Sequence, residues 1–232
     1  MPVFKHEGIT LNYKIQGTGV PFLYLHGLGD NLQHAFDTYQ PKNGIQLIAL
    51  DQRGHGKSNM DHKAMSFETL ASDALALMNY LGIDKFYIGG LSMGAGVVVN
   101  LAVHQSERLL GLILIRSAWT EQSMDKQIAL WFKTVSNYLA KPNGRELFHD
   151  DPIFQSIEQV YPRAIETFNR YFDDKAAIQY YQKFIDMPQD QPFKNKSELK
   201  RITVPVLILS NDYDMIHPLS YGYFYQDNIK KV

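Results

Sequence analysis

The chain has 232 residues, the length of a single domain, and it balances 23 Lys and Arg against 24 Asp and Glu for a net charge of −1. This balance, with no cluster of basic residues, excludes a dedicated nucleic-acid-binding protein, and the absence of cysteine excludes disulfides, thiolate metal sites and a cysteine nucleophile. The first ten residues lack the apolar segment of a secretory signal, and the longest apolar run, 109–115, is far shorter than the ~20 residues that span a bilayer. We therefore expect a cytoplasmic protein without a membrane span.

Short apolar runs alternate with helical patterns in the first half of the chain. Residues 10–16 alternate polar and apolar side chains, which predicts a half-buried strand, and buried strands are predicted at 22–25, 45–50, 86–88 and 109–115. Between them, Ser66 is expected to cap a helix that stops at Gly82, and a second helix is expected from Ser92 to about His104. Strands alternating with helices predict an α/β fold with a mostly parallel, doubly wound sheet.

The alternation stops after residue 115. Residues 119–199 have a helical, aromatic and proline-punctuated pattern, and a buried strand is predicted again at 204–209. A helix is predicted at 219–228, and residues 229–232 are typical of the start of a further strand. We therefore expect one α/β core, residues 1–117 and 202–232, interrupted by a helical insertion at 118–201.

The strongest chemical signal is the motif Gly90-Leu91-Ser92-Met93-Gly94. It follows a predicted buried strand and begins a predicted helix, which is the context of a nucleophilic serine held on a sharp turn. Glycines two positions before and after the serine allow strand and helix to approach closely. The hydroxyl would then lie at the carboxyl edge of the sheet, where ligands bind in such folds. The alternative is that Ser92 caps the helix in a glycine-rich turn.

Two further motifs follow predicted strands. The turn Leu25-His26-Gly27-Leu28-Gly29 would let the backbone N–H groups of Leu28 and Met93 hold a developing oxyanion, with His26 in a structural role; a tight turn without that function is the alternative. The segment 51–58, DQRGHGKS, ends like a phosphate-binding loop. Such a loop needs glycine at position 51 and a helix directly after Ser58, so we exclude a nucleotide site.

Together, HGLGD, DQRGHGKS and GLSMGAG resemble the α/β-hydrolase superfamily, and within it the lidded branch of esterases, lactonases and haloperoxidase-like enzymes. The resemblance covers about residues 3–117 and continues from 202 onward. It implies that Ser92 is the nucleophile, that Leu28 and Met93 form the oxyanion hole, and that the insertion is a lid. A serine at position 92 differs from the aspartate of the epoxide-hydrolase and haloalkane-dehalogenase branches.

The resemblance also implies an acidic residue directly after the strand at 204–209. The family pattern D-x-x-x-P selects Asp214 there, with Asp212 as the second choice, and an ordinary loop-capping role is the alternative for both. Asp214 would orient a catalytic histidine and stabilise its charged form.

The family places that histidine one helix and one strand beyond the acid, but no histidine follows His217. His217 is the only histidine expected near the site, but it lies three positions from Asp214, which is too close for the usual arrangement; its recruitment as the base is the alternative. The remaining histidines are assigned to a strand neighbourhood, turns, loops or helix surfaces: His6, His26, His34, His55, His62, His104 and His149. We therefore expect a truncated form of a longer active protein, without its last strand and helix, whose base lies about 10–20 residues past Val232. The present chain would then be nearly inactive.

The expected function is a serine hydrolase that cleaves small carboxylic esters, lactones or thioesters through an acyl-enzyme. Most aromatic residues of the insertion should pack internally, and a few should make the pocket apolar, which favours a small uncharged substrate. The alternatives are a catalytically degenerate binding protein of the same fold and a perhydrolase or C–C hydrolase with the same residues. No metal or organic cofactor is expected, because no HExxH motif or metal-site spacing of histidines is found.

Overall fold

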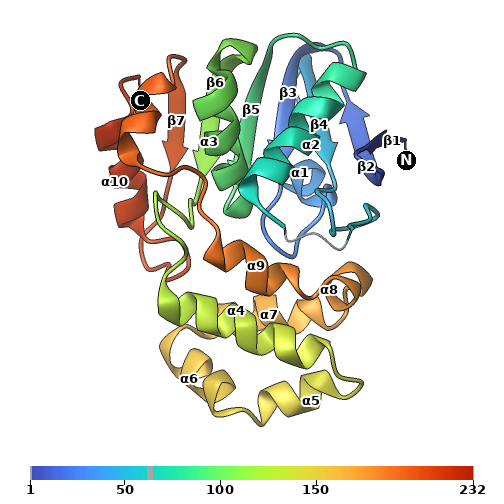
Figure 1. Ribbon diagram of the computed structural model, residues 1–232, viewed down its shortest axis with the longest axis vertical. Helices are drawn as coiled ribbons and strands as arrows, with labels where there is room; N and C mark the ends of the chain where they lie inside the picture. The colour runs from blue at the N-terminus through green and yellow to red at the C-terminus, as the bar shows by residue number, and fades with distance from the viewer. Residues whose placement is uncertain (1, 62–64, 232) are drawn as a thin grey trace.

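A computed structural model describes residues 2–61 and 65–231; His62, predicted in a loop, and Val232, predicted in a strand, lie outside the described residues. The described residues form one seven-stranded sheet in the order β1-β2-β4-β3-β5-β6-β7 (Figure 1). The strands are β1 (Val3–His6), β2 (Ile9–Gln16), β3 (Gly19–Leu25), β4 (Gly44–Leu50), β5 (Phe86–Leu91), β6 (Leu109–Ile115) and β7 (Val206–Leu209). Strand β2 pairs antiparallel with β1 and β4, and the remaining pairings are parallel. The predicted mostly parallel sheet is confirmed.

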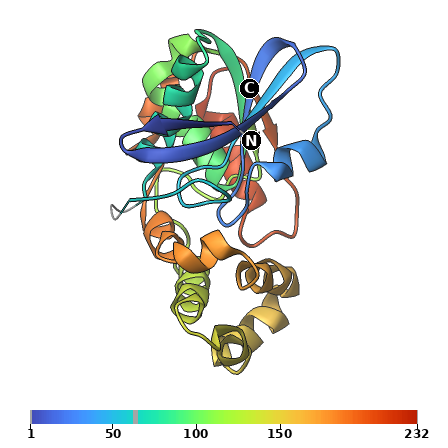
Figure 2. The ribbon, with the colours of Figure 1, turned by 90° about the vertical axis from the view of Figure 1, so that its right-hand side faces the viewer.

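Helices cover both faces of this sheet (Figure 2). Helices α2 (Phe67–Tyr80) and α3 (Met93–Gln105) pack on one face within the main apolar cluster, which also includes Tyr225 of α10 (Leu219–Asn228). Helix α1 (Gln33–Thr38) lies on the other face with a smaller cluster that includes Tyr24 and Leu47. Ser66 caps α2 as predicted, because its side chain accepts a hydrogen bond from the N–H of Thr69. The doubly wound arrangement is thus confirmed.

The segment between β6 and β7 is helical, as predicted, and lies beyond the carboxyl ends of the parallel strands (Figure 1). Its α-helices are α4 (Lys126–Leu139), α5 (Gly144–His149), α6 (Pro152–Val160), α7 (Pro162–Tyr171), α8 (Lys175–Gln179) and α9 (Lys183–Gln189). A 3₁₀ helix at Lys196–Arg201 leads back to the sheet, and another at Ser106–Arg108 precedes β6. We refer to residues 118–201 as the insertion.

The structure differs from the sequence-based expectations at short elements. Strand β1 and helix α1, of four and six residues, were not predicted, because neither is long enough to display a hydrophobic period. Residues 229–231 are not assigned to a strand, and Ile229 ends α10 by donating its N–H to the carbonyl of Tyr225; the Lys231 carbonyl accepts the N–H of Val206 in β7 at 2.9 Å, the single backbone bond to β7 that the described residues make at the predicted position. Strand β7 forms one edge of the sheet, with Leu207 and Leu209 exposed. Among the helices of the described residues, none combines the length and apolar character needed to cross a membrane.

Candidate active site

Ser92 lies on the turn between β5 and α3, in a strained backbone conformation with φ of 55° and ψ of −112°. The neighbouring glycines make this turn possible. A Cβ atom on Gly90 would lie 2.2 Å from the carbonyl carbon of Gly94, and one on Gly94 would lie 2.2 Å from the carbonyl oxygen of Leu25. Because both obstacles are backbone atoms, they cannot move aside cheaply. The predicted strand–turn–helix context of the motif is therefore present.

His217 connects Ser92 with Asp214. Its Nε2 lies 2.9 Å from the Ser92 Oγ, and its Nδ1 lies 3.1 Å and 3.0 Å from the two carboxylate oxygens of Asp214. A carboxylate can only accept, so Nδ1 carries the proton and Nε2 is free to accept the serine hydroxyl. The expectation that His217 is too close to Asp214 in the chain for this arrangement is wrong. That further residues follow position 232 stays a prediction.

The loop after β7 explains how so short a spacing can work. The Asp214 Oδ1 accepts hydrogen bonds from the backbone N–H groups of Ile216, at 3.2 Å, and His217, at 3.1 Å. The loop thus curls around its own carboxylate, which brings the imidazole onto Asp214. Asp212 is exposed to solvent, so of the two predicted aspartates the structure brings Asp214 into the site. A histidine at the last x of D-x-x-x-P, three residues after an aspartate able to form such a turn, is the available sequence signal.

Two side chains that sequence reasoning missed also bind Asp214. Arg116 follows β6 with φ of 46°, and both its Nε, at 3.0 Å, and its Nη2 donate to Oδ2 of Asp214. The same Nη2 lies 3.3 Å from the Nδ1 of His217. From the insertion, the hydroxyl of Tyr161 donates to Oδ1 at 3.0 Å. Neither residue belongs to a local motif, so only tertiary structure reveals the contacts.

These contacts set the protonation states of the site. Burial opposes ionisation of Asp214, but hydrogen bonds and charge from His217 and Arg116 prevail and hold its pKa well below the usual range. Burial lowers the pKa of His217; Asp214 opposes this shift, and the positive charge of Arg116 adds to it. The imidazole is therefore neutral at neutral pH, which is the form that a general base needs.

The backbone N–H groups of Leu28 and Met93, expected to hold an oxyanion, are not used in hydrogen bonds between the described residues. Met93 is the first residue of α3, where unpaired N–H groups and the helix dipole favour negative charge. The turn that carries Leu28 lies beside Ser92, since a Cβ on Gly27 would be 3.5 Å from the Cβ of the serine.

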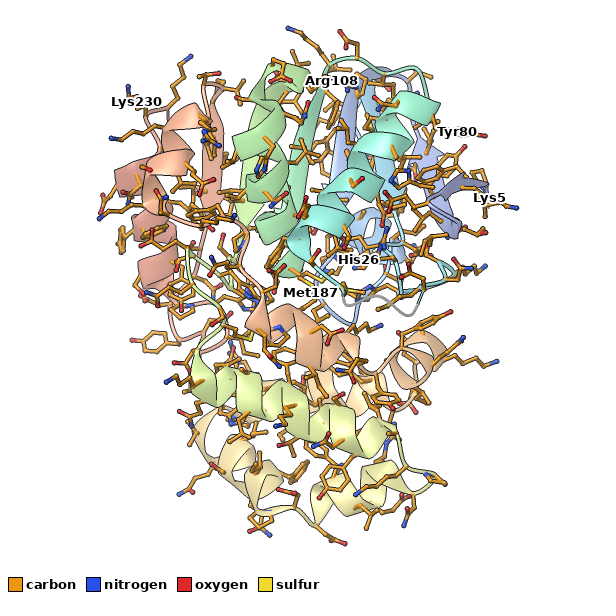
Figure 3. All side chains as sticks on the ribbon, viewed as in Figure 1. Lys5, His26, Tyr80, Arg108, Met187 and Lys230 are labelled. Atoms are coloured by element: carbon orange, nitrogen blue, oxygen red, sulfur yellow. The ribbon has the colours of Figure 1, made fainter. Side chains whose placement is uncertain are left out.

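His26 has a structural place in the same turn, as predicted. It is buried, its Nδ1 donates to the carbonyl of Gly27 at 2.8 Å, and its Nε2 accepts the N–H of Gln52 at 3.1 Å. Burial lowers its pKa, in agreement with a neutral ring that donates on one side and accepts on the other. Figure 3 labels His26 on the core side, and Met187 of α9 on the insertion side, of the boundary between the two parts.

A cavity of about 1030 Å³ opens in front of Ser92 and His217. Four aromatic residues of the insertion line it: Trp119, Phe132, Tyr161 and Tyr171. Charged residues line it as well, including Asp30, Arg163, Glu166, Arg170, Asp173 and Lys175, so the lining is mixed rather than apolar as predicted. The described residues contain no group of three or more His, Asp or Glu side chains placed to hold a metal ion.

Comparison with known proteins identifies the family of this fold. A family model described as "alpha/beta hydrolase fold" matches residues 20–232. The chain is 25% identical to the AB hydrolase superfamily protein YisY of Bacillus subtilis (97% of this chain, 85% of the relative) and 23% identical to 3-oxoadipate enol-lactonase 1 of Acinetobacter baylyi (98% and 85%). The solved enol-lactonase of Burkholderia xenovorans superposes with a TM-score of 0.74 at 20% identity, covering 99% of this chain and 88% of that one. With its family model, its sheet and its relatives in agreement, the chain belongs to the alpha/beta hydrolase fold family.

Proposed function

We propose that the protein is a serine hydrolase that cleaves small carboxylic esters, lactones or thioesters through an acyl-enzyme. The observation that carries this proposal is the continuous path from the Ser92 Oγ to His217 Nε2, at 2.9 Å, and from His217 Nδ1 to Asp214. A serine hydroxyl is a weak nucleophile at neutral pH, and a neutral imidazole within hydrogen-bond distance is what activates it. Relatives named as enol-lactonases support an ester-like substrate.

In the first half of the proposed reaction, the Ser92 Oγ attacks the carbonyl carbon while His217 Nε2 takes the hydroxyl proton. Asp214 stabilises the imidazolium that forms, and the N–H groups of Leu28 and Met93 hold the negative charge on the carbonyl oxygen. Each such donor contributes about 3–4 kcal/mol to lowering the barrier. The tetrahedral intermediate then collapses, and the leaving alcohol, enol or thiol takes the proton from His217.

In the second half, water replaces the leaving group. His217 removes a proton from the water as it attacks the acyl-enzyme, the same two amides hold the oxyanion, and the collapse returns the proton to the Ser92 Oγ and releases a carboxylic acid. We propose that the insertion acts as the lid of this site, since its residues Trp119, Phe132, Tyr161 and Tyr171 line the cavity. Its mixed lining accepts a substrate that carries a polar group away from the ester.

The test is labelling of Ser92 by a fluorophosphonate probe, together with turnover of p-nitrophenyl acetate. We expect the wild-type protein to be labelled at Ser92, S92A to be unlabelled, and H217A to lose turnover by about 10⁴-fold or more. D214N should lose a comparable factor, because His217 then loses its orienting carboxylate.

Matched controls lie outside the site. D212N changes the exposed neighbouring aspartate, and H104Q changes a histidine whose Nδ1 contacts the carbonyl of Asn100 on α3; both should keep wild-type turnover. Labelling with full turnover in H217A would assign the base to another group. A folded wild-type protein that neither reacts with the probe nor hydrolyses the ester would instead support the degenerate binding protein.

A further inference from the structure

Most backbone polar groups of the turn at residues 27–29 form hydrogen bonds; the Leu28 N–H, which we propose binds the oxyanion, forms none among the described residues. The peptide between Leu28 and Gly29 is bonded at both of its polar atoms. Its carbonyl oxygen accepts the hydroxyl of Tyr171 at 3.1 Å, and its N–H donates to the Nε2 of His55 at 3.1 Å. The preceding carbonyl, of Gly27, accepts from the His26 Nδ1, at 2.8 Å, and from the N–H of Asp30, at 3.2 Å. Among the described residues, the Leu28 N–H is left without a partner.

The two side chains that hydrogen-bond this peptide, His55 and Tyr171, come from different parts of the molecule. His55 belongs to the turn after β4; its Nδ1 donates to the carbonyl of Arg53 at 3.0 Å, which leaves Nε2 as an acceptor. Tyr171 ends α7 of the insertion, 143 positions from Leu28 in the sequence. The insertion therefore supplies one of the hydrogen bonds that hold the oxyanion turn.

Tyr171 is fixed in its own position by packing. Its side chain is buried, and its ring stacks on Phe184 of α9 with ring centroids 4.5 Å apart. The bare backbone of Gly29 makes room for it, since a Cβ there would lie 2.3 Å from the Tyr171 ring. Burial raises the pKa of Tyr171, so the hydroxyl keeps its proton and donates it to the carbonyl.

We propose that Tyr171 is a positioning residue for the oxyanion hole: its hydroxyl holds the Leu28 carbonyl so that the adjacent Leu28 N–H points at the reacting oxygen. This inference rests on the proposed function, because it assigns Tyr171 a part in that reaction. Without the hydroxyl, the turn retains its bonds to His55 and His26, but the Leu28–Gly29 peptide loses one of its two hydrogen bonds and its buried carbonyl is left unpaired. The Leu28 N–H is useful only when it is already aimed at the place where charge develops. Through this hydrogen bond the docked insertion acts on the oxyanion hole.

The decisive variant is Tyr171→Phe, which removes one hydroxyl and leaves the stacked ring. We expect kcat for p-nitrophenyl acetate to fall about 3- to 10-fold, the range that the loss of one hydrogen bond allows, while KM stays within about two-fold. The affinity for phenylboronic acid, which forms a tetrahedral adduct with a reactive serine, should fall by the same factor as kcat. A general structural defect would not lower kcat and the affinity for the boronate by the same factor.

Tyr138→Phe is the matched control, because it also removes one tyrosine hydroxyl from the insertion, where Tyr138 donates to Asp151 at 2.7 Å. It should change neither kcat nor boronate affinity. Unchanged kcat in a folded Tyr171→Phe protein would overturn the inference, and so would an equal loss in Tyr138→Phe or a change confined to KM.

A second measurement does not depend on activity. Amide hydrogen exchange over residues 27–30 should become at least about three-fold faster in Tyr171→Phe and remain unchanged in Tyr138→Phe, because only the first loses a bond to that turn. Unchanged exchange in Tyr171→Phe would overturn the inference. If the wild-type protein fails to react with the fluorophosphonate, the proposed function fails, and the exchange data still decide whether Tyr171 holds the turn.

Discussion

Asp214 and His217 lie three positions apart in one loop, and the carboxylate is held both by this loop and by Arg116 and Tyr161 from other parts of the chain. Two backbone N–H groups of the same loop bind Oδ1, but the Oδ2 contacts come from Arg116 and His217. Arg116 is half exposed to the cavity, whereas the side chain of Asp214 is almost fully buried. A cation beside the acid–base pair both anchors the carboxylate and disfavours a second positive charge on the imidazole.

Arg116→Gln should therefore change the pH dependence of the reaction. In the proposed reaction the reactive form has neutral His217, so kcat/KM should rise with pH through the pKa of His217. Because the charge of Arg116 lowers that pKa, its removal should raise the pKa and move the acidic limb of the profile to higher pH, more at low salt than at high ionic strength. Asp214, Tyr161 and Ser92 still face the histidine in this variant. The measurement is kcat/KM for p-nitrophenyl acetate from pH 5 to 9.

Arg116→Lys separates charge from geometry, because it keeps the cation and loses the fork that binds the carboxylate. It should lower the plateau of the profile without moving the acidic limb. Arg145→Gln is the control for charge alone, since Arg145 has a similar exposure and pairs with Asp173 within the insertion. An acidic limb that stays in place in Arg116→Gln would show that the arginine does not act on His217.

At the scale of elements, the sequence predicts those strands and helices whose apolar residues recur at a regular spacing. Strands β2 to β7 and helices α2, α3 and α10 were predicted close to their observed bounds, because their apolar residues recur with the period of a strand or a helix. Strand β1, helix α1 and the 3₁₀ helix Ser106–Arg108 are too short to show a period. The bounds of the helices within the insertion were not predicted either, because aromatic residues there pack in several directions.

One buried ion pair joins two of these elements. Arg53, in the turn after β4, binds Asp73 of α2 through its Nε, at 2.6 Å, and its Nη2, at 2.8 Å, and both side chains are buried. Asp73→Asn leaves the guanidinium buried without its counter-ion. We expect the free energy of unfolding, measured with urea, to fall by about 3–5 kcal/mol. The turn that carries His55 should loosen with it.

Asp84→Asn is the matched control, because Asp84 pairs with Arg108 at 3.5 Å while 87% of its side chain is exposed. An exposed pair contributes at most about 1 kcal/mol. The double variant Arg53→Met with Asp73→Leu should recover most of the lost stability, since replacing both partners by apolar groups leaves no buried charge. Equal losses in Asp73→Asn and Asp84→Asn would contradict this account.

At the scale of the whole molecule, some residues of the site lie in sequence motifs, and others reach the site only because the insertion packs against the core. Ser92, Leu28, Met93 and Asp214 follow strands within recognisable motifs, and their relative placement follows from the sheet. The spacing of His217 from Asp214 argues against a pair, but the loop folds back on its own carboxylate. Contacts made by the insertion, such as those of Tyr161 and Tyr171, join segments far apart in sequence. Their partners depend on how the insertion packs against the core, and the hydrophobic period of the sequence does not predict that packing.

The docked insertion also buries a lysine. Lys183 of α9 is fully buried, and its Nζ donates to the carbonyl of Gly54 in the core at 2.6 Å. Burial lowers its pKa from 10.5 to about 7, with Asp174 opposing the shift. Between those two pH values the folded protein has lost the proton that the unfolded chain keeps. The unfolded state then binds more protons, so this residue makes stability rise with pH over the interval from about 7 to 10.5.

Lys183→Met removes that titration while keeping an unbranched side chain of similar length. The free energy of unfolding of the wild-type protein minus that of the variant should be flat below pH 6. It should rise between pH 7 and 10, by at most about 1.4 kcal/mol per pH unit. Lys175→Met, at an exposed lysine of the neighbouring helix α8, should show no such rise. Urea unfolding at pH 5.5, 7, 8.5 and 10 provides the measurement. A difference that is constant over the whole range would mean that Lys183 titrates alike in the folded and unfolded chains, and that the insertion docks without burying its charge.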